Sequence, residues 1–198
     1  MLERCSDLSA AAWLERGDDP WPVLVTFGPS GYPSYARLRF LADPAFEGQP
    51  EGDADLGIAP YDTDQWPVLL EHLASHTRTP DDCFFCLWDG WPEVHAVLSG
   101  PRLGIPAGTY PPVRGYFVFH GPLSDFGIWG PPDIWPAEPP TCEPAFIWPA
   151  DHSWCVANDV DPHYAGIGGE RQLIEQLVSD SRLDVVATAP RDNHPRYR

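Results

Sequence analysis

Histidine and cysteine residues provide the first candidates for chemistry in this chain of 198 residues. His72 and His76 are four residues apart, which puts both imidazoles on one face of a helix, as a metal site requires. With Cys83 as a further ligand, they make a metal-dependent hydrolase one alternative. Leu73 stands where a zinc protease has its general-base glutamate. An exposed polar helix face explains the same pair, and we predict neither a metal nor a cofactor.

The second pattern is Cys83-Phe84-Phe85-Cys86, because a CxxC motif can bind zinc or carry out redox chemistry. It lies in the run Cys83–Trp88, which is typical of a fully buried strand. Positions i and i+3 of a strand face opposite sides of the sheet. We therefore predict two buried structural thiols.

The third pattern is Gly166-Ile167-Gly168-Gly169, which lies between a predicted strand and a predicted helix. Glycines at the beginning of a helix can hold phosphate. The loop has no lysine, however, and Asp159, Asp161 and Glu170 would repel an anion. We predict a tight turn whose glycines adopt positive φ angles.

Nucleophilic catalysis has little support in the sequence, which contains no G-x-S-x-G motif. His152 and Ser153 are adjacent, so in a strand their side chains would point to opposite faces. Cys155 stands between Trp154 and Val156, where a buried thiol is expected. We predict no catalytic residue.

Residues 43–64 form an acidic loop, with no arginine between Arg39 and Arg78. A loop of this length is usually either functional or mobile. It begins like a calcium loop but has no glutamate at the twelfth position and is interrupted by proline. We predict that its carboxylates contact a partner, namely Glu51, Asp53, Asp55, Asp62 and Asp64.

A second predicted contact loop, residues 121–149, is dominated by proline, tryptophan and glycine, and Trp129 and Trp135 are its candidate contacts. The chain has 25 prolines and nine tryptophans. Five of the tryptophans precede proline, which favours extended backbone and rings packed on the core. A tryptophan-lined pocket for a small ligand is the alternative.

The formal net charge of −17 includes twelve arginines and no lysine. It argues against binding to nucleic acid or to an anionic membrane, because both need a basic surface. It is compatible with a basic protein partner or with solubility alone. No signal peptide or long apolar span is visible, so we expect a cytoplasmic protein whose five cysteines are reduced.

The hydrophobic pattern predicts one α+β domain over residues 1–198, with a mostly antiparallel sheet, about three helices and long Pro/Trp-rich loops. Arg37 and Arg39 alternate with Ala36, Leu38 and Phe40, which indicates a half-buried strand, paired in a hairpin with residues 23–27. We expect a frayed tail at 190–198. Helices are expected at 6–16, 65–76 and 170–179, and strands at 23–27, 35–41, 83–88, 93–98, 102–105, 115–120, 153–160, 164–167 and 183–187.

Residues 77–187 resemble a group of actinobacterial proteins. The resemblance lies in TPDDCFFCLWDGW at 79–91, YFVFHGPL at 116–123, WPADHSWCVANDVD at 148–161 and GIGG at 166–169. It implies no particular activity, cofactor or catalytic residue. In size, charge and tryptophan content the chain is also similar to small acidic immunity proteins of bacterial toxin systems. Together these features predict an immunity-like or regulatory protein that binds a basic partner.

Overall fold

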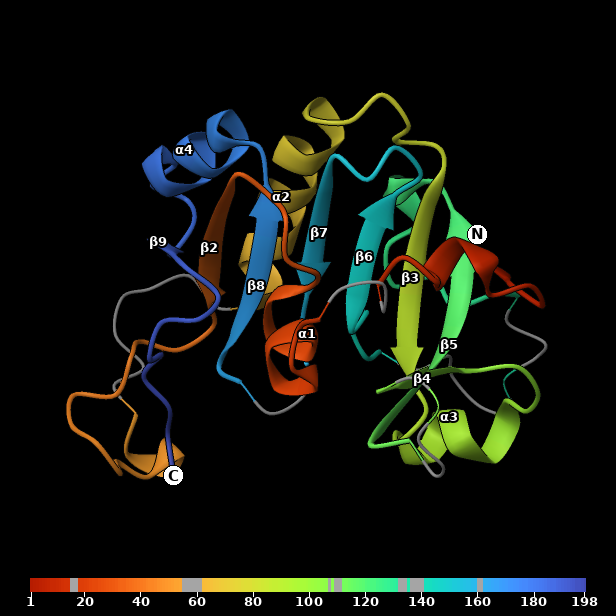
Figure 1. Ribbon diagram of the computed structural model, residues 1–198, viewed down its shortest axis with the longest axis horizontal. Coiled ribbons are helices and arrows are strands. Elements are labelled where there is room, and N and C mark those ends of the chain that lie inside the picture. The colour runs from red at the N-terminus through yellow and green to blue at the C-terminus, as the bar shows by residue number, and fades with distance from the viewer. Residues whose placement is uncertain are drawn as a thin grey trace.

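The computed structural model describes residues 1–14, 18–54, 62–106, 108, 112–131, 135, 141–159 and 162–198, with only the backbone of 62–64. These residues form an α+β fold around an antiparallel sheet of nine strands (Figure 1). The predicted fold class is confirmed, with four α-helices in the described part instead of about three.

The sheet has the strand order β1-β5-β3-β6-β7-β8-β2-β9, and β4 also pairs with β5. The strands are β1 Glu3–Arg4, β2 Ser34–Arg39, β3 Cys83–Trp88, β4 Leu103–Ile105, β5 Arg114–Gly121, β6 Phe146–Pro149, β7 Trp154–Ala157, β8 Tyr164–Gly169 and β9 Val185–Thr188. The α-helices are α1 Trp21–Phe27, α2 Asp62–Ser75, α3 Pro92–Val97 and α4 Arg171–Ser179. Short 3-10 helices are η1 Ser9–Ala11, η2 Glu51–Asp53 and η3 Leu123–Asp125.

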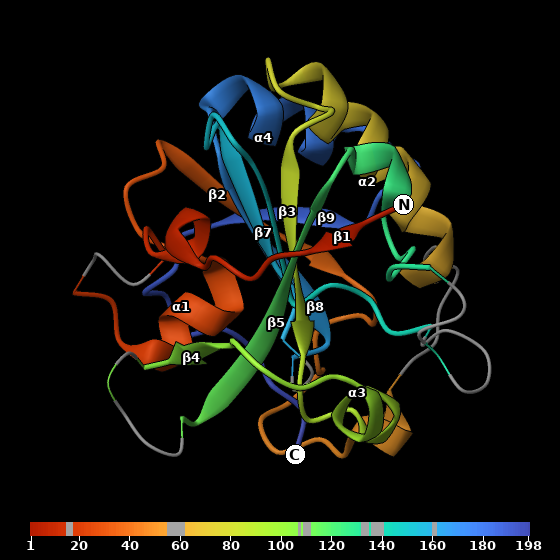
Figure 2. The same cartoon turned by 90° about the vertical axis from the view of Figure 1, so that its right-hand side faces the viewer.

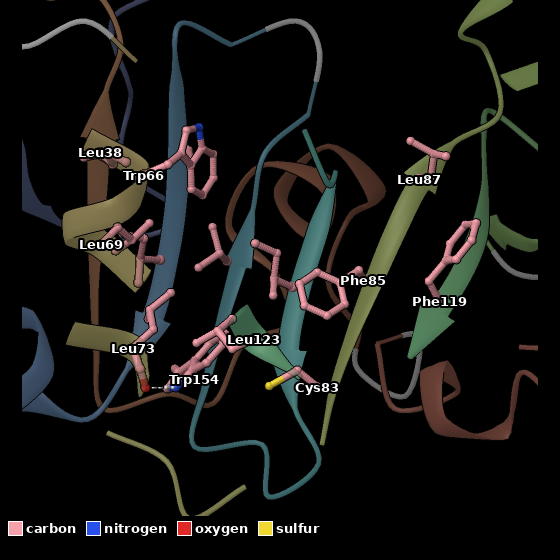
Figure 3. Packing of buried hydrophobic residues seen from close by; sticks show 14 of the residues in the cluster. Leu38, Trp66, Leu69, Leu73, Cys83, Phe85, Leu87, Phe119, Leu123 and Trp154 are labelled. Atoms are coloured by element: carbon pink, nitrogen blue, oxygen red, sulfur yellow. Dashed lines mark hydrogen bonds between the residues drawn. The ribbon is translucent and has the colours of Figure 1, made fainter. Parts of the chain in front are cut away.

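Helices lie on both faces of the sheet, so the core has two halves (Figure 2). On one face α2 and α4 pack against side chains such as Phe85 and Ile167. Trp154 lies in the same half, and its indole N–H donates to the Leu73 carbonyl over 2.9 Å (Figure 3). On the other face α1 and the N-terminal segment cover Trp148 and its neighbours.

Residues 23–27, predicted as a strand, belong to helix α1, and residues 93–98 fall mostly in helix α3. The predicted hairpin of residues 23–27 with β2 is therefore wrong, because β2 pairs with β8 and β9. Proline in the first turn of each helix explains the difference, since its fixed φ favours that position. The described part of the predicted helix at 6–16 contains the 3-10 helix η1.

Gly166, Gly168 and Gly169 lie inside strand β8, and none of them has a positive φ angle, so the predicted glycine turn is wrong. A Cβ atom at Gly166 would collide with the Thr26 carbonyl oxygen and come within 2.8 Å of the Phe27 Cα. Gly166 therefore lets the backbone of α1 approach the sheet closely. None of the helices in the described part of the chain is both long enough and apolar enough to cross a membrane.

Candidate partner-binding surface

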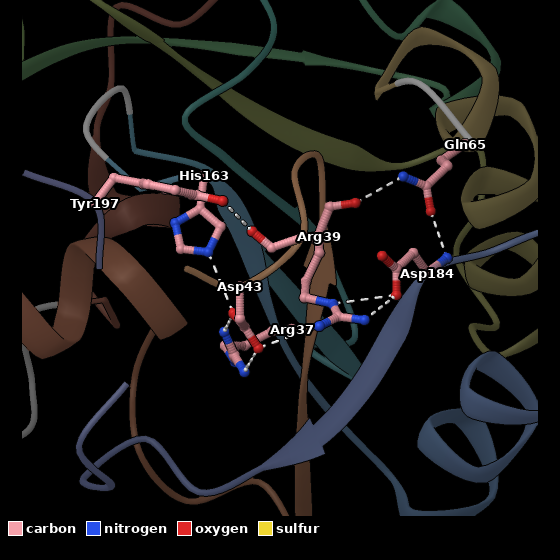
Figure 4. Close-up of polar contacts among 8 residues, drawn as sticks. Arg37, Arg39, Asp43, Gln65, His163, Asp184 and Tyr197 are labelled. Carbon is pink, nitrogen blue, oxygen red and sulfur yellow. Dashed lines mark hydrogen bonds and ion pairs between the residues drawn. The ribbon is translucent and has the colours of Figure 1, made fainter. Parts of the chain in front are cut away.

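The base of the acidic loop is fixed to the sheet by arginines of β2 (Figure 4). Arg37, which is 5% exposed, donates two hydrogen bonds to the Asp43 carboxylate, at 2.6 and 3.0 Å. Arg39 donates to Asp43 over 3.1 Å and, through Nη2, to Asp184 over 2.6 Å. Both arginines lie on the face of β2 that the alternating sequence predicts, opposite Ala36 and Leu38.

His163 also belongs to this cluster, with Nε2 3.2 Å from Asp43 Oδ1. Burial raises the pKa of Asp43, but hydrogen bonds from Arg37 and His163 outweigh it and hold the pKa at about 2. Burial lowers the pKa of His163, and Asp43 only partly opposes this shift. At neutral pH a neutral imidazole therefore donates its Nε2–H to an ionised carboxylate.

Gln49 orders the loop from within, and its side chain is mostly buried. Its Oε1 accepts from the Ala45 N–H over 2.7 Å, and its Nε2 donates to the Asp53 carbonyl over 2.8 Å. The Gln49 N–H also donates to the Phe46 carbonyl over 3.3 Å. The loop at 43–54 is thus held both at its base and across its span.

This ordered loop presents an apolar ring among carboxylates. Phe46 is 62% exposed, and Glu47, Glu51 and Asp53 are exposed as well. We name the exposed side of residues 43–54 the acidic surface. It includes Glu51 and Asp53 from the predicted contact set, whereas Asp55 and the side chains of Asp62 and Asp64 lie outside the described residues.

Trp129 and Trp135, the candidate contacts of the second loop, are 0% and 5% exposed. The Trp129 indole N–H donates to the Cys142 carbonyl over 2.9 Å, and that of Trp135 to the Trp129 carbonyl over 2.6 Å. Both rings are packed and their polar atoms are satisfied, so neither is available to a partner in this structure. The prediction that Trp129 and Trp135 are exposed contacts for a partner is therefore not met in this structure.

His72 lies on α2 and His76 directly follows this helix, and both side chains point towards α4. His72 Nε2 lies 2.9 Å from Asp180 Oδ2, and His76 Nε2 lies 2.7 Å from Gln176 Oε1. Among the described residues, no group of three or more His, Cys, Asp or Glu side chains could hold a metal ion. The pair therefore acts here as a polar link between two helices.

Cys83 and Cys86 are buried on opposite faces of β3, as the strand spacing predicts. Burial raises the pKa of the Cys83 thiol to about 12, and nearby Asp82 adds to the shift. The thiol is therefore protonated at neutral pH, which does not favour nucleophilic chemistry or metal binding.

Residues 189–198, which we name the C-terminal segment, return to the acidic surface (Figure 1). The Tyr197 hydroxyl donates to the Ala42 carbonyl over 2.7 Å, and the Arg198 N–H donates to the Gln49 carbonyl over 2.9 Å. The Tyr197 ring also meets the His163 ring edge to face, with centroids 4.9 Å apart. The segment predicted to be frayed thus has specific contacts near its end.

Two cavities lie where this segment, α1 and the acidic loop meet. The larger, of about 940 Å³, has Phe27, Phe46 and His194 in its wall. The smaller, of about 330 Å³, has Glu51 and His163 in its wall. The Thr26 hydroxyl also lies at these cavities but donates to the Pro22 carbonyl over 2.7 Å rather than to His163.

No protein-family model matches this chain, and no curated protein or solved structure matches it significantly. Its function is therefore inferred from the geometry and charge of this surface. The sequence predicted the carboxylates of the loop. Phe46 and Gln49 were missed, although an isolated phenylalanine in a polar run was a usable signal.

Proposed function

We propose that this protein binds a positively charged protein partner through the acidic surface, in a regulatory or toxin-neutralising role. The observation that supports the proposal most directly is Phe46, which is 62% exposed and is flanked by exposed carboxylates. Protein interfaces commonly combine an aromatic anchor with a polar rim. A phenylalanine kept in water by an ordered loop is well suited to be such an anchor.

The order of the loop supports the same proposal. Asp43 and Gln49 hold the loop before any partner arrives, so binding would cost less conformational entropy than it would for a flexible segment. The net charge of −17 would accelerate encounter with a basic protein and repel nucleic acid. The proposal includes the cytoplasmic location expected from the sequence.

The two alternatives from the sequence have weaker support. A metal-dependent hydrolase at His72 and His76 needs further ligands, and both imidazoles are already bonded to α4. A tryptophan-lined ligand site has Trp21 at the smaller cavity, but Trp129 and Trp135 are buried. No observation on the described residues favours either alternative over the acidic surface.

The test is affinity capture from the native host with the full-length protein, followed by titration of the captured partner. Phe46→Ala should weaken binding by about 30-fold, the effect of losing about 2 kcal/mol at an interface centre. Val178→Ala is the matched control, because Val178 is 45% exposed on α4, away from the acidic surface. Capturing no partner, or one that binds both variants equally, would overturn the proposal.

The charge contribution is tested separately with Glu47→Gln, Glu51→Gln and Asp53→Asn combined in one variant. The association rate should fall and become less sensitive to NaCl, because three steering charges are removed. Asp81→Asn, a change at an exposed carboxylate remote from the surface, should leave the rate nearly unchanged. Equal salt sensitivity in all three proteins would contradict the electrostatic part of the proposal.

A further inference from the structure

The C-terminal segment has the charge expected of a ligand for the acidic surface. It carries Arg191, Arg196 and Arg198 but only one acidic side chain, that of Asp192. All three arginines are exposed. The segment reaches the surface through the contacts of Tyr197 and the Arg198 backbone, and its His194 ring packs on Phe27 with centroids 4.6 Å apart.

Asp19 provides an independent indication that a guanidinium belongs here. Its side chain is 3% exposed, and its Oδ2 accepts from the Ser30 N–H over 2.8 Å. Its Oδ1 is buried and has no hydrogen-bond partner among the described residues. Among the described residues, the Arg191 guanidinium forms the ion pair with Asp19, with its Nη2 3.8 Å from Oδ1.

That distance is too long for a hydrogen bond but short enough for ionic attraction. A buried carboxylate oxygen without a donor is costly, and a guanidinium that came about 1 Å closer would satisfy it. The Arg191 side chain is itself 75% exposed, so it lies near Asp19 without forming a hydrogen bond with it. A different arginine, on a segment less constrained than this one, could bind Asp19 directly.

An open groove lies beside the segment. The cavity of about 940 Å³ lies between the segment, α1 and the acidic loop, with Asp18 and Glu47 in its wall beside Arg191 and Arg196. The segment therefore contacts the acidic surface at a few positions and leaves much of this cavity open.

We propose that the C-terminal segment is a displaceable occupant of the acidic surface. The partner would present an extended, arginine-containing segment that replaces it and places one guanidinium on Asp19. This inference rests on the proposed function, since it specifies the chemistry of the partner at the acidic surface and at Asp19, which the C-terminal segment also approaches. While the segment is seated, it lowers the apparent affinity of the surface for the partner.

The experiment uses the full-length protein and a fluorescent synthetic peptide with the sequence of residues 189–198, followed by anisotropy. Tyr197→Ala removes the hydroxyl contact with Ala42 and the ring contact with His163, which loosens the segment in cis. The peptide should bind this variant about tenfold more tightly than it binds the wild type. Arg171→Ala, on the exposed face of α4, is the matched control and should bind as the wild type does.

Asp19→Asn in the Tyr197→Ala background tests the guanidinium position. Asparagine keeps an oxygen for the Ser30 N–H, so the fold should be retained, and thermal unfolding checks this directly. Peptide affinity should fall about tenfold relative to Tyr197→Ala alone. Asp81→Asn in the same background removes an equal charge elsewhere and should have little effect.

Equal peptide affinity in the wild type and Tyr197→Ala, or no binding to either, would overturn the inference. This result is distinct from failure of the proposed function. A partner that depends on Phe46 but is insensitive to Tyr197→Ala and Asp19→Asn would leave the function intact and remove the inference. Peptide binding as expected, with no partner captured from the host, would show that the segment is displaceable but would remove the proposed function, and with it the part of the inference that concerns a partner.

Discussion

Asp43 binds three cationic or polar side chains, two from nearby positions in the sequence and one from a distant position. Arg37 and Arg39 precede it on β2, and His163 follows 120 residues later. The Arg37 guanidinium is buried, so its charge depends on this carboxylate for compensation. A single substitution at Asp43 should therefore affect both the stability of the sheet and the order of the acidic loop.

Asp43→Asn should lower the free energy of unfolding by about 3 kcal/mol, because it leaves Arg37 buried without its counter-ion. Urea denaturation at pH 7 measures the change, with Asp81→Asn as the control at an exposed carboxylate. A loss no greater than that of the control would show that water compensates the guanidinium.

The same pair of proteins has a defined pH dependence. The pKa of Asp43 is about 2 in the folded protein, below its ordinary value of 3.8, so its contribution is fully present above about pH 4. It is lost as the pH falls through 2. The stability difference between wild type and Asp43→Asn should therefore shrink between about pH 4 and pH 2. A constant difference would contradict the role given to Asp43.

At the scale of elements, the contact of α1 with β8 depends on backbone proximity. Leu24 and Val25 direct the buried face of α1 towards one half of the core. Gly166 faces the last turn of the helix, with no side chain between the two backbones. The helix covers the sheet beside the larger cavity, so its position also determines the shape of the groove.

Gly166→Ala should destabilise the protein by about 3 kcal/mol, because the added methyl group would collide with backbone atoms of α1 that cannot rotate away. Gly52→Ala is the matched control, since no atom lies within 4 Å of its added Cβ and its φ is not positive. Thermal unfolding of both variants measures the difference. Similar midpoints would mean that α1 can move outward at little cost.

The elements that the sequence predicted well are those in which local pattern and tertiary setting agree. Cys83–Trp88 is a strand with the expected faces, and α4 lies within the helix expected at 170–179. Leu173, Ile174 and Leu177 of this helix are buried, whereas Val178, which the sequence places on the same stripe, is exposed. In α1 the two disagree. Val23 and Val25 favour a strand, but Pro22 lies in the first turn of a helix, and Gly166 of β8 leaves room for the backbone of that helix. The local sequence around residues 21–27 does not indicate this long-range contact with β8.

The candidate surface was predictable only in part, for a similar reason. The carboxylates of the loop were visible as a charge pattern, and the alternation of Arg37 and Arg39 correctly indicated their shared face. The pairing of β2 with β8 brings His163 close to Asp43 and the two arginines. A single sequence does not specify this pairing. The seating of Tyr197 on Ala42 depends on the same long-range arrangement.

At the scale of the whole molecule, 29 acidic side chains face 12 arginines. Several arginines are already bound in ion pairs, including Arg37, Arg39 and Arg114, so a large excess of carboxylates is left uncompensated. Mutual repulsion of these charges opposes the compact state.

Screening this repulsion should stabilise the protein. Raising NaCl from about 20 mM to about 300 mM should increase the midpoint of thermal unfolding by a few degrees. Sucrose at matched osmolality separates screening from solvent exclusion, since it has no ionic effect. A midpoint that is unchanged or lower in NaCl would mean that local ion pairs dominate over the net charge.

The position of β2 between β8 and β9 has a consequence for how the chain folds during synthesis. β2 is complete at residue 39, but its first partner ends at residue 169 and its second at residue 188. Pairings this distant in sequence form slowly, and an unpaired strand is open to aggregation in the meantime. Arg37 and Arg39 place charges at alternate positions of this strand while it is unpaired, which discourages association with other chains. The arginines that later hold Asp43 thus first protect the nascent strand.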